Sequence, residues 1–113
     1  MELPVGFSGA ISGQYVNTSQ TIGSPVVLVN MSSTSYNISN PIPANTQVTI
    51  TCTGTNAGGY GMALCDTSGN VIEYINHSAT ASTDNKHTFT AQTVETKLYV
   101  SVNKFDSAVY TLV

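Results

Sequence analysis

Two cysteines and two histidines are the residues of this sequence best suited to nucleophilic, acid–base or metal chemistry. Cys52 and Cys65 are separated by twelve residues, and neither belongs to a C-x-x-C motif or has a histidine at the spacing typical of zinc sites. His77 and His87 are of the type used as general bases, but no Ser or Cys near them stands in a nucleophile-elbow context. We interpret both histidines as ordinary surface residues beside a polar loop. The sequence therefore predicts no catalytic residue and no metal ligand.

The two cysteines are expected to point to opposite faces of their strands. Cys52 alternates with Val48 and Ile50 and is predicted to face inward, whereas Cys65 directly follows the core position Leu64 and is predicted to face outward. Two cysteines whose Cβ vectors diverge cannot be joined without backbone movement. We predict two free thiols that pack as small hydrophobic side chains, with a disulfide as the alternative.

The carboxylates do not form a recognisable catalytic or calcium-binding pattern. A glycosidase needs two carboxylates that face each other across a cleft, whereas the six in this chain are scattered through predicted turns and outer strand faces. They are Glu2, Asp66, Glu73, Asp84, Glu95 and Asp106. Asp66 and Asn70 offer oxygen ligands for a hard cation, but the DTSGN segment lacks the dense acidic pattern of a calcium loop. We predict that the protein is not an enzyme and needs no cofactor.

Tyrosine is the residue type that most favours ligand binding. The chain has six Tyr and three Phe but no Trp. An exposed Tyr ring beside amide and hydroxyl side chains offers a stacking face and hydrogen bonds, which suits a sugar. We select Tyr60, Tyr74 and Tyr99 as candidate ligand-binding residues. The alternative is that these rings cover the sheets and belong to the core.

The elements that position these residues are β-strands, and the clearest signal is a hairpin over residues 60–76. Two apolar runs flank the segment DTSGN, whose Asp, Ser, Gly and Asn residues suit a tight reversal. Met62 and Leu64 are predicted to face the core, with Ala63 and Cys65 on the opposite face.

The rest of the chain reads as further short strands separated by turns. They are predicted over residues 11–16, 26–31, 34–38, 46–53, 86–90, 96–103 and 109–113. Residues 11–16 are expected at a sheet edge, the nearly continuous apolar run 26–31 is expected to be covered on both faces, and residues 77–85 form a polar loop. Seven to nine short strands without helical periodicity predict one all-β domain over residues 1–113. We expect an antiparallel two-sheet β-sandwich of the jelly-roll type.

The composition excludes two classes of partner. Only 8% of the residues are charged, the net charge is −3, and Ser, Thr and Asn make up about a third of the chain. Three lysines cannot neutralise a row of phosphates, so we expect no nucleic-acid binding. No apolar run approaches the ~18 residues of a membrane helix, so we expect no membrane insertion.

The order of elements resembles a known class of domain. A Gly-containing first strand (ISGQYV) precedes PANTQVTIT, YGMALCDTSGNVIEYI, a polar loop and HTFTAQTVETKLYVSV. This order resembles the small jelly-roll, carbohydrate-binding-module-like domains of bacteriophage virion proteins, found in tails, baseplates or on capsid surfaces. The resemblance implies a non-catalytic recognition module for host attachment, with a surface glycan or other virion proteins as partners. The alternative is a purely structural phage protein, such as a capsid decoration or stabilising protein.

The same resemblance implies where and how the protein works. It implies a virion-surface or extracellular location and a homo-oligomer or part of a larger assembly. The N-terminal sequence MELPVGFSGAIS lacks the basic and apolar regions of a signal peptide. We therefore expect assembly in the host cytoplasm, or a module of a larger chain.

Overall fold

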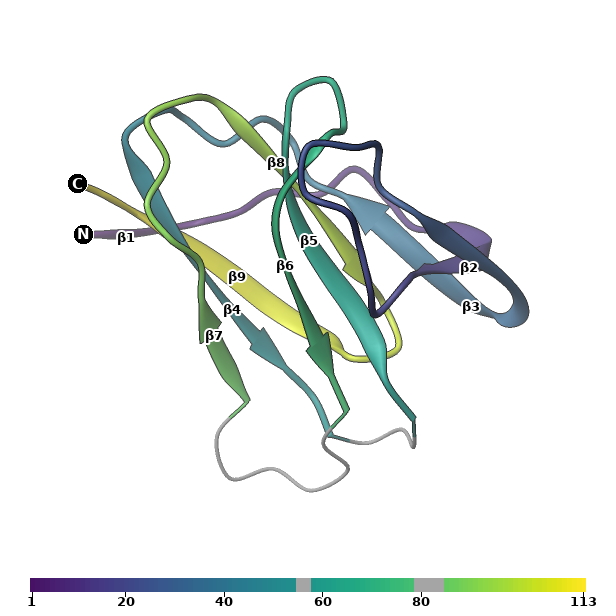
Figure 1. Ribbon diagram of the computed structural model, residues 1–113. Helices are drawn as coiled ribbons and strands as arrows, with labels where there is room; N and C mark the ends of the chain where they lie inside the picture. The colour runs from purple at the N-terminus through teal and green to yellow at the C-terminus, as the bar shows by residue number, and fades with distance from the viewer. Residues whose placement is uncertain (55–57, 79–84) are drawn as a thin grey trace.

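The computed structural model describes residues 1–54, 58–78 and 85–113, and within these ranges the chain forms nine β-strands and no helix (Figure 1). A four-stranded sheet contains β1 (Glu2–Pro4), β9 (Phe105–Leu112), β4 (Thr46–Cys52) and β7 (Lys86–Thr88), in that order. A five-stranded sheet contains β2 (Ile11–Val16), β3 (Leu28–Ile38), β8 (Thr96–Ser101), β5 (Tyr60–Asp66) and β6 (Val71–His77). All pairings between these strands are antiparallel, which confirms the predicted two-sheet, all-β fold. Those ranges contain no helix with the length and hydropathy of a membrane span.

The strand order is that of a jelly roll with one additional strand. When β2 is set aside, the sheets have the orders β1-β9-β4-β7 and β3-β8-β5-β6. Successive strands then alternate between the two sheets, except at the β5–β6 hairpin. This is the double Greek-key arrangement of a jelly roll. Strand β9 pairs with both β1 and β4, which brings the two ends of the chain to the same edge of the molecule (Figure 1).

The main core lies between the two sheets and follows the period-two alternation of the sequence. In β4, Val48, Ile50 and Cys52 are buried while the Gln and Thr residues between them are partly exposed. Met62 and Leu64 of β5 face them from the other sheet with no exposed surface, as predicted. Complete burial of a side chain such as Leu64 contributes about 1.5–3 kcal/mol to stability.

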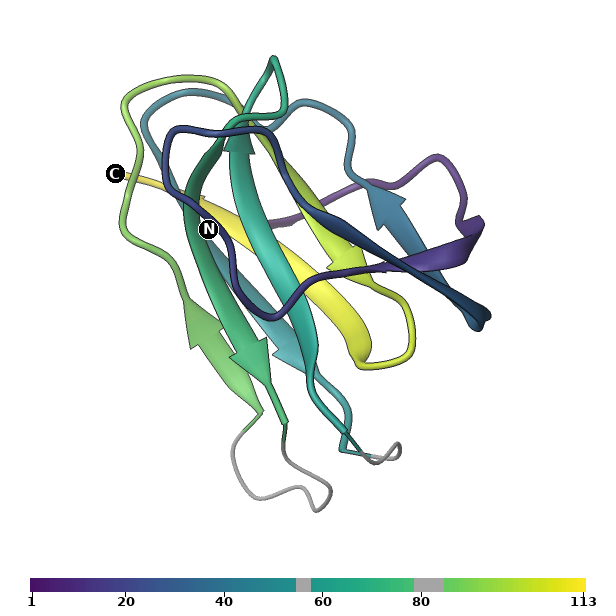
Figure 2. The ribbon, with the colours of Figure 1, turned by 45° about the vertical axis from the view of Figure 1, so that its right-hand side comes forward.

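A second hydrophobic cluster covers the outer face of the five-stranded sheet. Its buried members are Val16, Tyr36, Ala63, Cys65 and Val71. Residues 17–27 cross this face in front of β5 and β6 (Figure 2) and bond to the hairpin turn. The Gly23 N–H donates to the Val71 carbonyl, and the Val26 N–H donates to the Gly69 carbonyl. The sheet is therefore covered on both faces, so Ala63 and Cys65 are fully buried although they point away from the main core.

Several predicted strands differ from the structure in extent or burial. Residues 26–31 and 34–38 do not form two strands, because residues 28–38 belong to β3. Met31 is exposed rather than covered on both faces, because it lies where the register of β3 with the edge strand β2 is interrupted, between Asn30 and Ser35. Val102 lies in a turn after β8 and is exposed, and β9 begins at Phe105 rather than at residue 109. The strand β1 was not predicted, and most of the predicted loop 77–85 lies outside the described residues.

Candidate functional site

The three tyrosines selected from the sequence all lie on the five-stranded sheet, but they do not form one surface. Tyr74 of β6 and Tyr99 of β8 each lie directly opposite Ala63 of β5, so they flank this small residue on the outer face. Tyr60 is opposite His77 and has the other parity along β5. The structure thus brings Tyr74 and Tyr99 together and leaves Tyr60 apart.

Tyr99 and Tyr74 contribute to the second hydrophobic cluster, against which both rings pack. A Cβ atom added to Gly69 would lie 3.1 Å from the Tyr99 hydroxyl, so the Tyr99 ring reaches the β5–β6 turn. Burial raises the pKa of Tyr99, and its proximity to Cys65 acts in the same direction. These contacts favour the alternative interpretation of Tyr99, in which the ring covers the sheet.

Tyr60 instead forms an aromatic pair with Tyr15 of β2. The ring centroids are 5.0 Å apart and the planes are inclined by 72°, an edge-to-face arrangement, and both rings are partly exposed. The side chains of Thr18 and the exposed Asn76 lie beside Gly59, the residue preceding Tyr60. We call this region, formed by Tyr15, Tyr60, Thr18 and Asn76, the tyrosine-pair surface. Its aromatic rings are those of Tyr15 and Tyr60, and Thr18 and Asn76 lie beside the adjoining residue Gly59.

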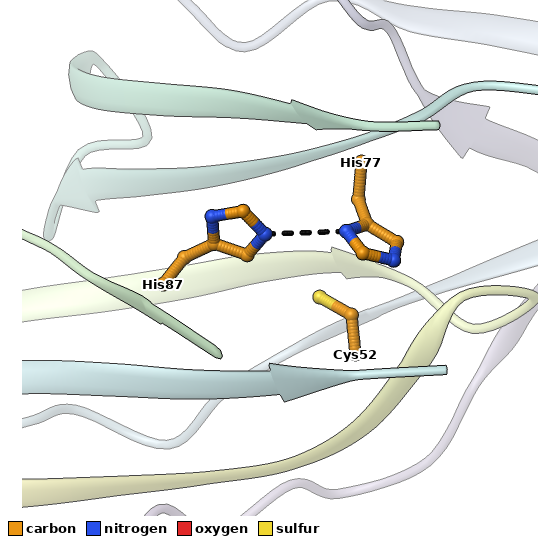
Figure 3. Close-up of side chains that lie close together, drawn as sticks. All are labelled: Cys52, His77 and His87. Atoms are coloured by element: carbon orange, nitrogen blue, oxygen red, sulfur yellow. Dashed lines mark hydrogen bonds between the residues drawn. The ribbon is translucent and has the colours of Figure 1, made fainter. Parts of the chain in front are cut away.

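A second group of chemically capable residues lies between the sheets at one end of the sandwich. Cys52 ends β4, His87 lies on the neighbouring strand β7 opposite Ile50, and His77 ends β6 of the other sheet. His77 Nδ1 and His87 Nε2 are 3.1 Å apart. One donor atom from each of the three residues lies within 4.8 Å of the other two, and the Cys52 sulfur points toward the two rings (Figure 3).

Burial controls the protonation of this Cys–His–His cluster. Desolvation raises the pKa of the Cys52 thiol to about 11, although the nearby Lys104 ammonium opposes the shift. Desolvation also lowers the pKa of His77, and the proximity of His87 and Lys104 acts in the same direction. At neutral pH the cluster therefore holds a protonated thiol and a neutral His77 ring. A buried, protonated thiol is a poor nucleophile, and metal ligation would likewise require Cys52 to lose its proton.

Comparison with protein-family models, with curated proteins and with solved structures finds no match.

The interpretation of His77 as a surface residue is wrong. Its side chain is only 3% exposed, and among the described residues its Nε2 atom has no hydrogen-bond partner. The hairpin register contained the missed signal, because Met62 pairs with Ile75 and the same parity turns His77 inward. No pattern in the sequence could show that Cys52 and His87 lie beside His77, since they come from strands of the other sheet. Sequence reasoning also missed Tyr15.

Asp66 serves the turn rather than an evident cation site. Its Oδ1 atom accepts hydrogen bonds from the backbone N–H groups of Ser68 at 2.9 Å and Asn70 at 3.0 Å. The Asn70 side-chain amide donates to Oδ2 at 3.4 Å. The hydrogen bond from the Asn70 backbone is the largest cause of the lowered Asp66 pKa. These contacts make the segment an Asx-type turn that closes the hairpin.

Both cysteines are free and buried, in agreement with the predicted thiols. Cys52 belongs to the main core and Cys65 to the second cluster, so they lie on opposite faces of the five-stranded sheet. Burial raises the pKa of Cys65 to about 12, and the Asp66 carboxylate adds to the shift. Cys65 points away from the main core, as predicted, but its side chain is buried because residues 17–27 cover this face of the sheet.

Proposed function

We propose that this protein is a non-catalytic recognition module of a virion or cell surface that binds carbohydrate at the tyrosine-pair surface. The observation that carries the proposal is the partly exposed, edge-to-face pair of Tyr15 and Tyr60 next to Thr18 and Asn76. Sugar rings bind proteins through aromatic faces together with hydroxyl and amide hydrogen bonds. The low charge of the chain suits a neutral ligand better than a charged one.

A site of this size would bind one sugar weakly, so function in host attachment would require several copies. Linking weak sites raises the overall affinity without any new contact, provided that the ligands can be reached together. The proposal therefore includes a homo-oligomer or a larger assembly, with a surface glycan as the external partner. In this proposal Tyr74 and Tyr99 help to hold the sheet and do not contact the ligand, because both rings pack against the second hydrophobic cluster.

The test is binding of the chain to an array of host-envelope glycans, both free and displayed at high density. We expect Tyr60→Ala to weaken binding by about tenfold, the equivalent of the ~1.4 kcal/mol expected for one aromatic contact. Tyr74→Ala is the matched control, because it removes an equally large, partly exposed ring that packs on the second hydrophobic cluster and does not belong to the Tyr15–Tyr60 pair. The proposal is wrong if the chain binds no glycan either free or displayed at high density. It is also wrong if Tyr60→Ala and Tyr74→Ala bind glycan equally well.

One observation favours the structural alternative, a decoration or stabilising protein. Ile11 and Met31 are 45% and 47% exposed, and they belong to the β2–β3 hairpin, which extends beyond the rest of the sandwich (Figure 1). Strand β2 is also a sheet edge, and an unpaired edge invites pairing with another chain. Sedimentation with assembled particles tests this role. The structural role is excluded if the chain is a stable free monomer that does not sediment with particles, and if Met31→Lys leaves this sedimentation unchanged.

A further inference from the structure

We propose that Cys52 Sγ, His77 Nδ1 and His87 Nε2 form a binding site for a zinc ion between the two sheets. The proposal does not rest on carbohydrate recognition, because none of the three ligands belongs to the tyrosine-pair surface, although Tyr60 lies directly opposite His77 on the neighbouring strand. The spacing of these three residues in the sequence did not predict a metal site, and none of them has a part in the tyrosine-pair surface.

The distances between the donor atoms are close to those of a zinc site. With Zn–N bonds of about 2.0–2.1 Å and a Zn–S bond of about 2.3 Å, tetrahedral geometry places the nitrogens about 3.4 Å apart and each nitrogen about 3.6 Å from sulfur. His77 Nδ1 and His87 Nε2 are already 3.1 Å apart. The Cys52 sulfur lies within 4.8 Å of one ring nitrogen of each histidine, so a Zn–S bond would require a movement of about 1.2 Å at most relative to those nitrogens.

The strands hold the three residues in place before any ion binds. Cys52 and His87 project from the paired strands β4 and β7, and His77 projects from β6 of the opposite sheet. Cys52 and His77 are each only 3% exposed, so their side chains have little freedom to move apart. A hydrogen bond between the two rings would explain the short N···N distance alone. It would not explain why the thiol points toward the same space (Figure 3).

The donor set selects the class of metal. One thiolate and two imidazoles are ligands for zinc and neighbouring transition metals, whereas magnesium and calcium require oxygen ligands. Zinc is commonly bound by three protein side chains with a water or another ligand in the fourth position. His87 is partly exposed, which leaves one side of the cluster accessible to an ion from solvent.

Binding requires Cys52 to lose its proton. As the Zn–S bond forms, the thiol S–H bond breaks and one proton is released to solvent, while both imidazoles bind as neutral ligands. The fully buried Lys104 lies close enough to affect both Cys52 and His77. Its charge favours the Cys52 thiolate and the neutral His77 ring, whereas the Asp106 carboxylate opposes formation of the thiolate.

The experiment is a titration of the metal-free chain of residues 1–113 with Zn²⁺ in competition with a chromogenic chelator. We expect the titration to give one Zn²⁺ per chain. We also expect about one proton to be released per ion, which calorimetry measures from the dependence of the binding heat on the buffer. Co²⁺ serves as an absorbing substitute, and we expect a thiolate-to-cobalt charge-transfer band. His87→Gln should weaken zinc binding at least about 100-fold, because loss of a residue that only orients a ligand already costs 10–100-fold.

Two further variants separate ligation from structural effects. Cys52→Ser should abolish the charge-transfer band, whereas Cys65→Ser is the matched control and should keep both the band and the affinity. Cys65 is equally buried but lies in the second cluster. Melting curves establish that each variant is folded. The proposal is overturned if the chain binds no stoichiometric zinc, if cobalt gives no thiolate band, or if His87→Gln binds as tightly as Cys65→Ser.

Discussion

Gly61→Ala is the substitution that most directly tests how residues 17–27 are held against the five-stranded sheet. A Cβ atom at Gly61 would lie 2.1 Å from the Asn17 carbonyl oxygen and 2.8 Å from that of Val16. Both are backbone atoms, so no side-chain rotation can relieve the overlap. Val16 is fully buried, and its N–H donates to Ser101 Oγ at 2.9 Å. The chain must therefore either keep the strain or lift Val16 from the sheet.

Either response should lower the free energy of unfolding. Retaining an overpacked contact costs about 1–3 kcal/mol, and exposing Val16 costs about 1.5–3 kcal/mol. Replacing a strand Gly with Ala returns about 0.5–1 kcal/mol through lower conformational entropy of the unfolded chain. We expect a net loss of about 1–1.5 kcal/mol for Gly61→Ala. Gly59→Ala is the matched control, because its shortest overlap, at 2.6 Å, is with the exposed side chain of Asn76, which can rotate away.

Two measurements test the expectation. Urea unfolding gives the free-energy change, and Gly59→Ala should differ from the parent chain by about 0.5 kcal/mol or less. Labelling with a thiol reagent, resolved by peptide mass spectrometry, reports whether Cys65 becomes accessible as residues 16–17 lift, while Cys52 in the main core should keep its rate. Equal stability of the two variants, together with unchanged Cys65 labelling, would show that the second cluster is not packed as described.

Two further predictions concern the β5–β6 turn and the hydrogen bonds at Gly61. Because the folded Asp66 pKa is below its ordinary value of 3.8, its stabilising effect is complete above that pH and is lost as the pH falls through the folded pKa. Asp66→Asn should flatten this acid-side loss in pH-dependent unfolding, and an unchanged slope would contradict the assignment. Ser101 Oγ accepts from the Val16 N–H and donates to the Gly61 carbonyl, so Ser101→Ala should cost about 1–3 kcal/mol in urea unfolding. A cost no larger than that of Gly59→Ala would contradict it.

Much of the fold followed from local patterns. The alternation in residues 46–53 correctly placed Val48 and Ile50 in the core, because successive strand residues point to opposite faces. The DTSGN segment correctly predicted the β5–β6 hairpin, since the Asp66 carboxylate and the positive φ of Gly69 satisfy the turn locally. These signals require no knowledge of distant contacts.

Only part of the candidate sites could be predicted from the sequence. Tyr60 was selected from the sequence and lies on the tyrosine-pair surface, but its partner Tyr15 comes from a strand that pairs elsewhere in the same sheet. Tyr99 was also selected from the sequence, and it lies on the outer face of the five-stranded sheet. The selection could not reveal that residues 17–27 close over that face, since a segment without periodicity carries no signal of where it packs.

The sequence by itself determined that the chain forms short antiparallel strands, which side chains face inward along β4 and β5, and that the two thiols diverge. These properties depend on the two-residue repeat of a strand and on turn chemistry, which are local. Only the tertiary structure decided that Cys65 is buried and that Cys52, His77 and His87 meet. Both depend on which strands become neighbours across the sandwich, and that pairing is fixed by the packing of the whole core.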